Sequence, residues 1–331
     1  APIALNFTTS GGPKPSDVSI GSAGVAQTAQ VVVTLDQPIK EGTVIADFAQ
    51  ITGVNGSVAQ RSPNQIVFSI NGGLCQNFSL VLKEGIASEV NKEVSEAWKF
   101  DSRIICGTTS VIGYSLKGRP IIAYYFGNGS ESILFTGGIH GSERSGQQTM
   151  QAFVDHLMLN GTPIPDNRRL VVVPNTNPDG IAAGSRNNAN NVNVDRNFPA
   201  SNWQADIETA SGYLKNGGGT APGSEPEAKA LIALTRQLRP RLSVSYHAQG
   251  SLVGANQVGI SVSAGNVYAS TVGYGTMYGM AEEVMGYAIT GEYEDWMGEE
   301  LGVAAILIEL PTPNGNYLTS QLPAIRKLLS L

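Results

Sequence analysis

Short runs of apolar and β-branched residues alternate with turn-forming residues over the first hundred positions. The runs are Val31–Leu35, Ile66–Ile70 and Phe78–Leu82. The turn signals include Asn55-Gly56 and Asn71-Gly72-Gly73. Several short strands at this spacing, with no helical period between them, are typical of an all-β sandwich. We therefore expect a small all-β sandwich domain over residues 1–103, followed by a linker over residues 104–111.

After about one hundred residues the pattern changes to compact apolar runs that alternate with helix-like stretches. The runs are Ile133–Phe135, Leu170–Val173, Leu242–Ser245 and Ala305–Ile308. In the stretch 145–159, apolar residues recur at spacings of three and four, which predicts an amphipathic helix. Buried strands joined by helices favour an α/β domain over residues 112–331, with a mixed, mostly parallel sheet flanked by helices. The Asn-rich stretch 187–193 is expected to be a surface loop.

Composition and charge exclude several classes of function. The 331 residues are 41% hydrophobic and 15% charged, so the chain can build sizeable cores. Lys and Arg number 21 against 27 Asp and Glu, giving a formal charge of −6, which argues against a nucleic-acid partner. The longest apolar runs, such as Val303–Ile308, are far shorter than the ~20 residues that a membrane helix needs.

Cysteine and histidine are scarce, which limits the metal sites that the chain can form. Two cysteines, Cys75 and Cys106, exclude a four-thiolate zinc site, so a transition metal must be bound by His and carboxylates. The two cysteines could form one disulfide or stay as free thiols, and the sequence leaves both possibilities open. Ala1 in place of Met predicts a processed N-terminus, and we expect a secreted or periplasmic protein.

One motif carries the strongest chemical signal: Gly137-Gly138-Ile139-His140-Gly141-Ser142-Glu143. His140 and Glu143 are three residues apart between a buried strand and a helix, so both side chains can reach one ion. His247 ends another buried run, where α/β sheets place their ligand sites. Two His and one carboxylate form a catalytic zinc ligand set with one position left for water. The third histidine, His156, is expected on the solvent face of the helix and not at the metal.

These motifs and several others occur in the order found in a known family. The others are Ile112-Gly-Tyr-Ser-Leu-Lys-Gly-Arg-Pro-Ile, Asn177-Pro-Asp-Gly, Arg186-Asn, Val194-Asp-Arg-Asn-Phe-Pro, Ser224-Glu-Pro-Glu and Ile308-Glu309-Leu310. From about residue 112 to the C-terminus, the chain resembles the zinc carboxypeptidase family, and most closely its compact bacterial members that trim peptidoglycan peptides. The first domain more loosely resembles the bacterial immunoglobulin-like modules that are fused to secreted enzymes.

The resemblance implies roles for the residues at matching positions. It implies one zinc ion bound by His140, Glu143 and His247, and it makes Glu309 the general base that acts on zinc-activated water. Arg186 matches the arginine that stabilises the oxyanion of the substrate. Arg196 matches the arginine that binds a substrate carboxylate.

Three further substrate-binding residues follow from the same alignment. Tyr287 falls where the family carries its mobile tyrosine that caps the substrate. Glu294 falls at the base of the specificity pocket, where a carboxylate would favour an ammonium-bearing side chain. Asp195 departs from the family, because an asparagine usually precedes the arginine here. A carboxylate at this position would repel a bare carboxylate or weaken Arg196, or it would accept an ammonium group.

The sequence therefore predicts a zinc metallopeptidase that hydrolyses an amide bond next to diaminopimelate in peptidoglycan stem peptides. Its partner would be a peptide or muropeptide, and the first domain could contact the cell wall. One alternative is a general carboxypeptidase that removes C-terminal basic residues. Another is an N-acyl amino acid deacylase of the aspartoacylase and succinylglutamate desuccinylase group.

Overall fold

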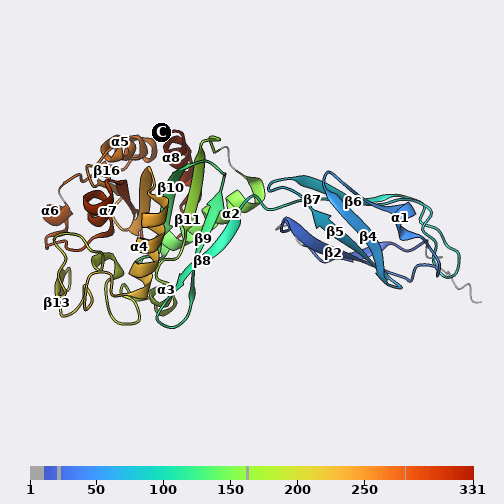
Figure 1. Ribbon diagram of the computed structural model, residues 1–331, viewed down its shortest axis with the longest axis horizontal. Coiled ribbons are helices and arrows are strands. Elements are labelled where there is room, and N and C mark those ends of the chain that lie inside the picture. Colours follow the sequence, from blue (N-terminus) through green and yellow to red (C-terminus); the bar gives the residue numbers. More distant parts are fainter. Residues whose placement is uncertain (1–10, 21–23, 162–163, 280) are drawn as a thin grey trace, which may run out of the picture. The chain divides into compact units, whose positions relative to one another are not determined.

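The computed structural model describes residues 11–20, 24–161, 164–279 and 281–331, so Ala1 lies outside the described residues. The chain forms two compact units, shown in Figure 1. Unit 1 comprises residues 1–106 and 158–161, and unit 2 comprises residues 107–157 and 162–331.

Unit 1 is built from two antiparallel sheets. The first has the order β1 (Pro15–Val18), β2 (Thr28–Leu35), β5 (Gln65–Asn71), β4 (Asn55–Ser62). The second has the order β3 (Ala49–Thr52), β6 (Asn77–Leu82), β7 (Trp98–Arg103), and the short helix α1 (Ile45–Phe48) precedes β3. Alternate side chains of β2, β5 and β6 are buried in one apolar core that both sheets share. The period of two in these strands thus produces the predicted sandwich.

The three predicted strands of this unit are confirmed, since they lie within β2, β5 and β6. The predicted turn at Asn55-Gly56 is wrong, because both residues pair with β5 as the first residues of β4. The chain turns two residues earlier, at Gly53, whose positive φ of 90° suits glycine. Cys75 and Cys106 form a disulfide, which decides the alternative that the sequence left open.

The stretch 104–111 differs from the predicted linker. Ile104 is fully buried in the core of unit 1, and Cys106 is held by its disulfide. Residues 108–111 begin strand β8 of unit 2, where they pair with β9. Most of this stretch is therefore either packed in unit 1 or paired in the sheet of unit 2.

Unit 2 contains a mixed sheet of eight strands. Their order is β16 (Gly275–Thr276), β15 (Leu252–Ala255), β17 (Ala304–Leu310), β14 (Leu242–Ala248), β10 (Glu131–Gly137), β11 (Arg168–Val173), β9 (Pro120–Phe126), β8 (Thr108–Tyr114). The four central strands β17, β14, β10 and β11 are parallel, and β15 on one side and β9 on the other pair with them in antiparallel orientation. Each of the four predicted buried runs lies in one of these central strands.

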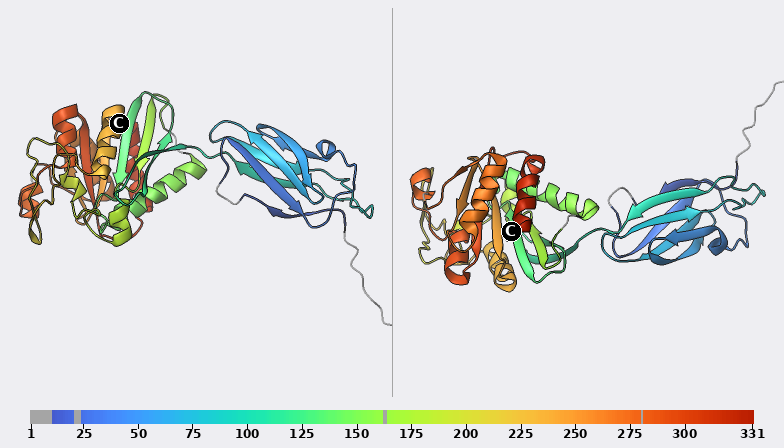
Figure 2. Two further views of the ribbon diagram at one scale, coloured as in Figure 1. Left: turned by 60° about the horizontal axis from the view of Figure 1, so that its bottom comes forward. Right: turned by 90° about the horizontal axis from the view of Figure 1, so that it is seen from above.

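Helices cover both faces of this sheet, as Figure 2 shows. Helices α4 (Pro226–Leu238) and α7 (Tyr293–Leu301) share a core with one face. On the other face, Phe153 of α2 (Arg144–Asn160) packs on Phe135, and α5 (Ser261–Val272) places Tyr268 against Tyr246. Helix α8 (Leu318–Ser330) packs beside α5. The predicted α/β fold is thus confirmed, and helix 145–159 lies within α2.

Smaller elements complete unit 2. They are α3 (Pro178–Ala183), the 3-10 helix η1 (Val194–Arg196), β12 (Ile207–Thr209), β13 (Gly212–Leu214) and α6 (Ala281–Met285). Among the described residues, no helix combines the length and apolarity needed to cross a membrane.

Candidate metal centre and catalytic cleft

The candidate ligands lie at the carboxyl ends of central strands of the sheet. Strands β10, β14 and β17 are parallel neighbours, so the segments that follow their carboxyl ends meet. The turn between β10 and α2 carries His140 and Glu143, and β14 carries His247 near its end. Gly141 permits this turn, because a Cβ atom there would lie 2.0 Å from the backbone of Gly180.

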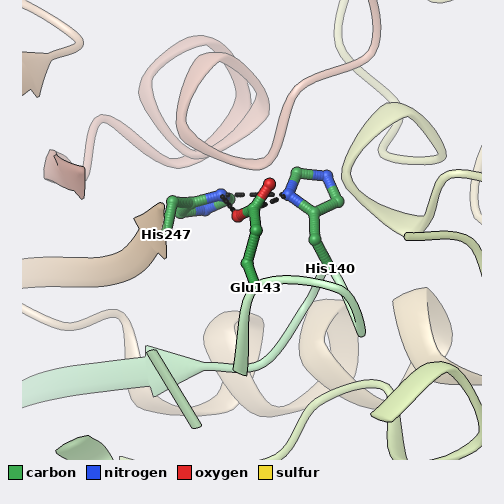
Figure 3. Close-up of side chains that lie close together, drawn as sticks. All are labelled: His140, Glu143 and His247. Atoms are coloured by element: carbon green, nitrogen blue, oxygen red, sulfur yellow. Dashed lines mark hydrogen bonds and ion pairs between the residues drawn. The ribbon is translucent and has the colours of Figure 1, made fainter. Parts of the chain in front are cut away.

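The three side chains bring one donor atom each to a common point (Figure 3). Nδ1 of His140 lies 3.1 Å from Oε2 of Glu143 and 3.2 Å from Nδ1 of His247. Nδ1 of His247 lies 3.5 Å from the same carboxylate oxygen. Donor atoms of a tetrahedral zinc site are about 3.4 Å apart when each bond is ~2.0–2.1 Å long. The spacing and the two-histidine, one-carboxylate chemistry therefore fit one zinc ion.

The charges around these donors also favour a cation. Burial and the nearby Arg186 lower the pKa of His140. Burial opposes ionisation of Glu143, but His140, His247 and Arg186 hold the pKa of that carboxyl well below its usual range. Burial would lower the pKa of His247, whereas its hydrogen bond with Glu143 and the charge of Asp195 raise it to about 10. The carboxylates of Glu143 and Asp195 that act on His247 provide negative charge, which suits a metal ion.

Asn193 orients one of the candidate ligands and was not predicted to do so. Its Oδ1 atom lies 3.0 Å from Nε2 of His140 and also accepts a hydrogen bond from the backbone N–H of Asp195. A hydrogen bond at Nε2 turns Nδ1 of His140 toward Glu143 and fixes the tautomer. The Asn-rich stretch was predicted as a surface loop, but Asn188 and Asn193 are buried within it.

Glu309 lies on β17 directly beside His247 of β14 in the strand register. Its Oε2 atom is buried and has no hydrogen-bond partner in the described chain. Burial and the charge of Glu143 raise the pKa of Glu309 to about 7, although the charge of His247 opposes this shift. The structure thus places a carboxyl group that can exchange a proton near neutrality next to the candidate ligands.

Arg186 approaches the same group from the loop after α3. Its Nη1 atom donates to Oε1 of Glu143, while about a third of its side chain stays exposed. The guanidinium is thus both a partner of a candidate ligand and accessible from the solvent side. This placement agrees with a charge that faces a reacting carbonyl group.

Arg196 and Asp195 are buried in η1, and they pair with each other. Nη1 of Arg196 donates to Oδ2 of Asp195 at 2.7 Å and lies 3.6 Å from Oε1 of Glu292. Oδ2 of Asp195 also lies 3.9 Å from Nε2 of His140. Asp195 therefore compensates the charge of Arg196, which is one of the possibilities that the sequence left open. Glu292 was not predicted, and burial and the charge of Asp195 raise its pKa well above the usual range, although Arg196 opposes this shift.

A cavity of about 640 Å³ opens beside Arg186, and we call it the catalytic cleft. Its walls are formed by Arg186, Asn193, Arg196, Gln249, Met285, Tyr287 and the β12–β13 hairpin. Tyr287, which lies just after α6, is therefore in the same cavity as both predicted functional arginines. The hairpin wall was not predicted from the sequence.

A second cavity, which we call the acidic pocket, has a volume of about 330 Å³. Its carboxylates come from Glu282, Glu283, Glu292, Glu294 and Asp295. Glu292 lines this pocket and contacts Arg196, which lines the catalytic cleft, so the walls of the two cavities meet at this pair. Glu294 is 4% exposed and accepts a hydrogen bond from Ser245, but its buried Oε2 atom has no partner within the described residues.

Replacing Glu294 by Gln should stabilise the protein in a pH-dependent manner. Burial and the charge of Asp195 raise the pKa of Glu294 to about 7. Because the folded state then holds this proton more firmly than the unfolded state, wild-type stability falls as pH rises from about 4.5 to 7. Glutamine does not titrate, so the variant lacks this loss. Its free energy of unfolding should therefore exceed that of the wild type by about 2–3 kcal/mol more at pH 8 than at pH 5.

Urea unfolding of both proteins at the two pH values measures this difference. Glu283 is exposed in the same pocket and is a matched control, so Glu283→Gln should change stability little. A gain for Glu294→Gln that does not depend on pH would contradict the raised pKa.

His156, which was expected on the solvent face of the helix, lies in the same unit as the candidate ligands. It lies on α2 and is partly buried, and it is not among the three residues whose donor atoms converge.

Comparison with known proteins places this site in a family. The profile of the zinc carboxypeptidase family matches residues 106–325, which is most of unit 2. The chain belongs to the zinc carboxypeptidase family of peptide-bond hydrolases. The resemblance of the motifs is thereby confirmed, and so is the assignment of zinc as the metal that fits the His-Glu-His cluster.

The names of two curated relatives refer to murein peptides and to a gamma-D-glutamyl-L-diamino acid bond. Murein peptide amidase A of Escherichia coli is 38% identical over 150 residues, which cover 42% of this chain and 58% of the relative. Gamma-D-glutamyl-L-diamino acid endopeptidase 1 of Lysinibacillus sphaericus is 26% identical over 183 residues, covering 43% and 46%. The chain thus spans about half the length of these relatives.

Solved structures agree with the fold. The murein-tripeptide amidase MpaA of Escherichia coli has a TM-score of 0.54 and 29% identity, covering 67% of this chain and 92% of its own. Thrombin activatable fibrinolysis inhibitor has a TM-score of 0.57 at 18% identity, covering 68% of this chain and 69% of its own, and so shares the fold alone.

Proposed function

We propose that this chain is a zinc-dependent metallopeptidase that hydrolyses an amide bond next to diaminopimelate in peptidoglycan stem peptides. The observation that carries the proposal is the acidic pocket, which has the buried, unpaired carboxylate oxygen of Glu294 in its wall, in the same unit as a candidate zinc site. The similarity to murein peptide amidase A agrees with this substrate class.

The residues around the metal centre divide the reaction between them. A zinc ion held by His140, Glu143 and His247 would polarise the scissile carbonyl group and activate a water molecule for attack. Glu309 accepts a proton from the attacking water and then protonates the leaving amine. Arg186 stabilises the negative charge that develops on the carbonyl oxygen. What supports these roles is the proximity of Glu309 and Arg186 to the candidate ligands.

The acidic pocket supports a substrate residue that carries an extra ammonium group. A buried carboxylate without a full set of partners is costly, and an incoming ammonium group would satisfy Glu294 and neutralise part of the pocket. An uncharged or acidic side chain would leave that cost in place, which disfavours it. Tyr287, which lines the neighbouring cleft, would cover the bound residue.

The pairing of Arg196 supports a zwitterionic group rather than a bare carboxylate. Asp195 already compensates the charge of Arg196, so the guanidinium offers a lone substrate carboxylate little net positive charge. The distal centre of diaminopimelate carries both an ammonium and a carboxylate group. It can therefore pair with Arg196 and with the surrounding carboxylates together.

A general carboxypeptidase for C-terminal Lys or Arg is the second candidate, because Glu294 would also favour a basic side chain. The two candidates differ in what the pocket must bind. A lysine side chain brings one positive charge, whereas diaminopimelate brings a zwitterion and needs both Arg196 and the carboxylates.

Digestion of defined muropeptides by the zinc-loaded protein tests the proposal, with mass spectrometry used to identify the released fragments. We expect stem peptides that contain diaminopimelate to be cleaved beside that residue, and those with lysine in its place at least about tenfold more slowly. If diaminopimelate peptides stay intact while protein with stoichiometric zinc cleaves acyl-lysine, the basic carboxypeptidase replaces our proposal.

A matched variant shows whether the pocket sets this preference. Glu294→Gln should lower the preference for diaminopimelate over an apolar residue, mainly through KM, whereas Glu283→Gln at the exposed rim should change it little. Acyl-lysine and acyl-phenylalanine substrates, assayed side by side, provide the reference.

We also propose that the protein is secreted or periplasmic and that unit 1 contacts the cell wall. The disulfide between Cys75 and Cys106 supports an oxidising compartment. A substrate in the cell wall also lies outside the cytoplasm. The resemblance of unit 1 to bacterial immunoglobulin-like modules stays a prediction.

A further inference from the structure

The β12–β13 hairpin forms one wall of the catalytic cleft and presents an aromatic side chain there. Tyr213 is 69% exposed and lines the same cavity as Arg186 and Arg196. A large aromatic ring left in water beside a polar reaction site is available to bind a ligand, because its face gains from contact with apolar groups.

Hydrogen bonds hold this ring in place. The hydroxyl group of Tyr213 donates to Oδ2 of Asp206, and Oδ1 of Asp206 accepts from the backbone N–H of Asn216. Asp206 thus ties the ring to the chain that leaves the hairpin. A ring that is already ordered loses little conformational entropy when a ligand binds to it.

The hairpin itself is fixed to the loop that carries the candidate site. At its base Ile207 is buried, and the carbonyl group of Gly217 accepts a hydrogen bond from the backbone of Asn193. Glu208 pairs with Tyr213 across the two strands, so their side chains share one face. Oε2 of Glu208 accepts a hydrogen bond from the backbone N–H of Ala288, next to Tyr287. The ring therefore keeps a set position relative to the cleft.

We propose that Tyr213 is a specificity-determining residue that binds the part of the peptide substrate extending beyond the two residues at the scissile bond. This inference rests on the proposed peptidase function. If the acidic pocket holds the residue on the amine side, the remaining peptide must leave through the catalytic cleft, whose wall is the hairpin. The ring then packs against the backbone and side chain of that extension.

Two substrates that differ only in length test the inference with the zinc-loaded full chain. One is the dipeptide that flanks the scissile bond, and the other carries one further residue at its N-terminal end. Wild-type protein should cleave the extended peptide with a kcat/KM about five- to tenfold higher, because of the added contact. Tyr213→Ala should lose that gain through KM, with kcat/KM for the dipeptide unchanged.

Two further variants separate the role of the ring from other effects. Tyr213→Phe keeps the ring and should keep most of the gain. Tyr114→Ala removes a comparably exposed tyrosine outside the cleft and should behave as wild type. Equal cleavage of both substrates by the wild type, or an equal loss on both in Tyr213→Ala, would overturn the inference. Failure of the wild type to cleave either peptide would instead count against the proposed function.

Discussion

Replacing Glu309 by Gln should lower kcat by about 10²–10⁴-fold and leave the zinc content unchanged. The amide cannot take up the proton that the carboxylate accepts from water, but it has nearly the same shape. Glu309 is also not one of the three residues whose donor atoms converge on the metal position. Measurement of kcat on a substrate that the wild type cleaves, together with zinc analysis, checks this result.

A glutamate in the other unit controls for the substitution itself. Glu89 is exposed in unit 1, so Glu89→Gln should retain wild-type kcat and zinc content. If Glu309→Gln keeps more than about a tenth of the wild-type kcat, Glu309 is not the general base. If it loses zinc, the residue supports the metal centre rather than proton transfer.

The sequence predicted the core of the fold because burial has a periodic signature. The four central strands of unit 2 are buried on both faces, so each appears as a continuous apolar run. Strand β8 lies at the sheet edge and is largely exposed, so its residues gave no such signal and were partly assigned to a linker. The hairpin β12–β13 has two three-residue strands, which are too short for periodicity to reveal.

The site was predictable to the extent that its residues lie in local motifs. His140, Glu143, His247 and Glu309 each follow or end a buried run, and parallel strands bring such positions together. The partners of these residues come from distant loops. Asn193 contacts His140, and Glu292 contacts Arg196, only because tertiary packing brings them together. No spacing along the chain indicates such contacts.

Replacing any one of the three candidate ligands by Ala should abolish stoichiometric zinc binding. His140, Glu143 and His247 each supply one of three donor atoms, and the loss of one leaves two protein ligands for an ion that is stably held by three or four. We expect the zinc affinity to fall at least about a hundredfold in each variant. Competition with a chelator of known affinity, followed by metal analysis, measures this loss.

The third histidine provides the matched control. His156→Ala removes an imidazole from α2, the helix that follows His140 and Glu143. This variant should bind one zinc ion per chain with wild-type affinity. Zinc should also raise the unfolding temperature of the wild type and of His156→Ala, since an ion that binds only the folded state stabilises it. The ligand variants should lose this shift. A ligand variant that retains one zinc ion and the full shift would refute the site, whatever substrate the enzyme cleaves.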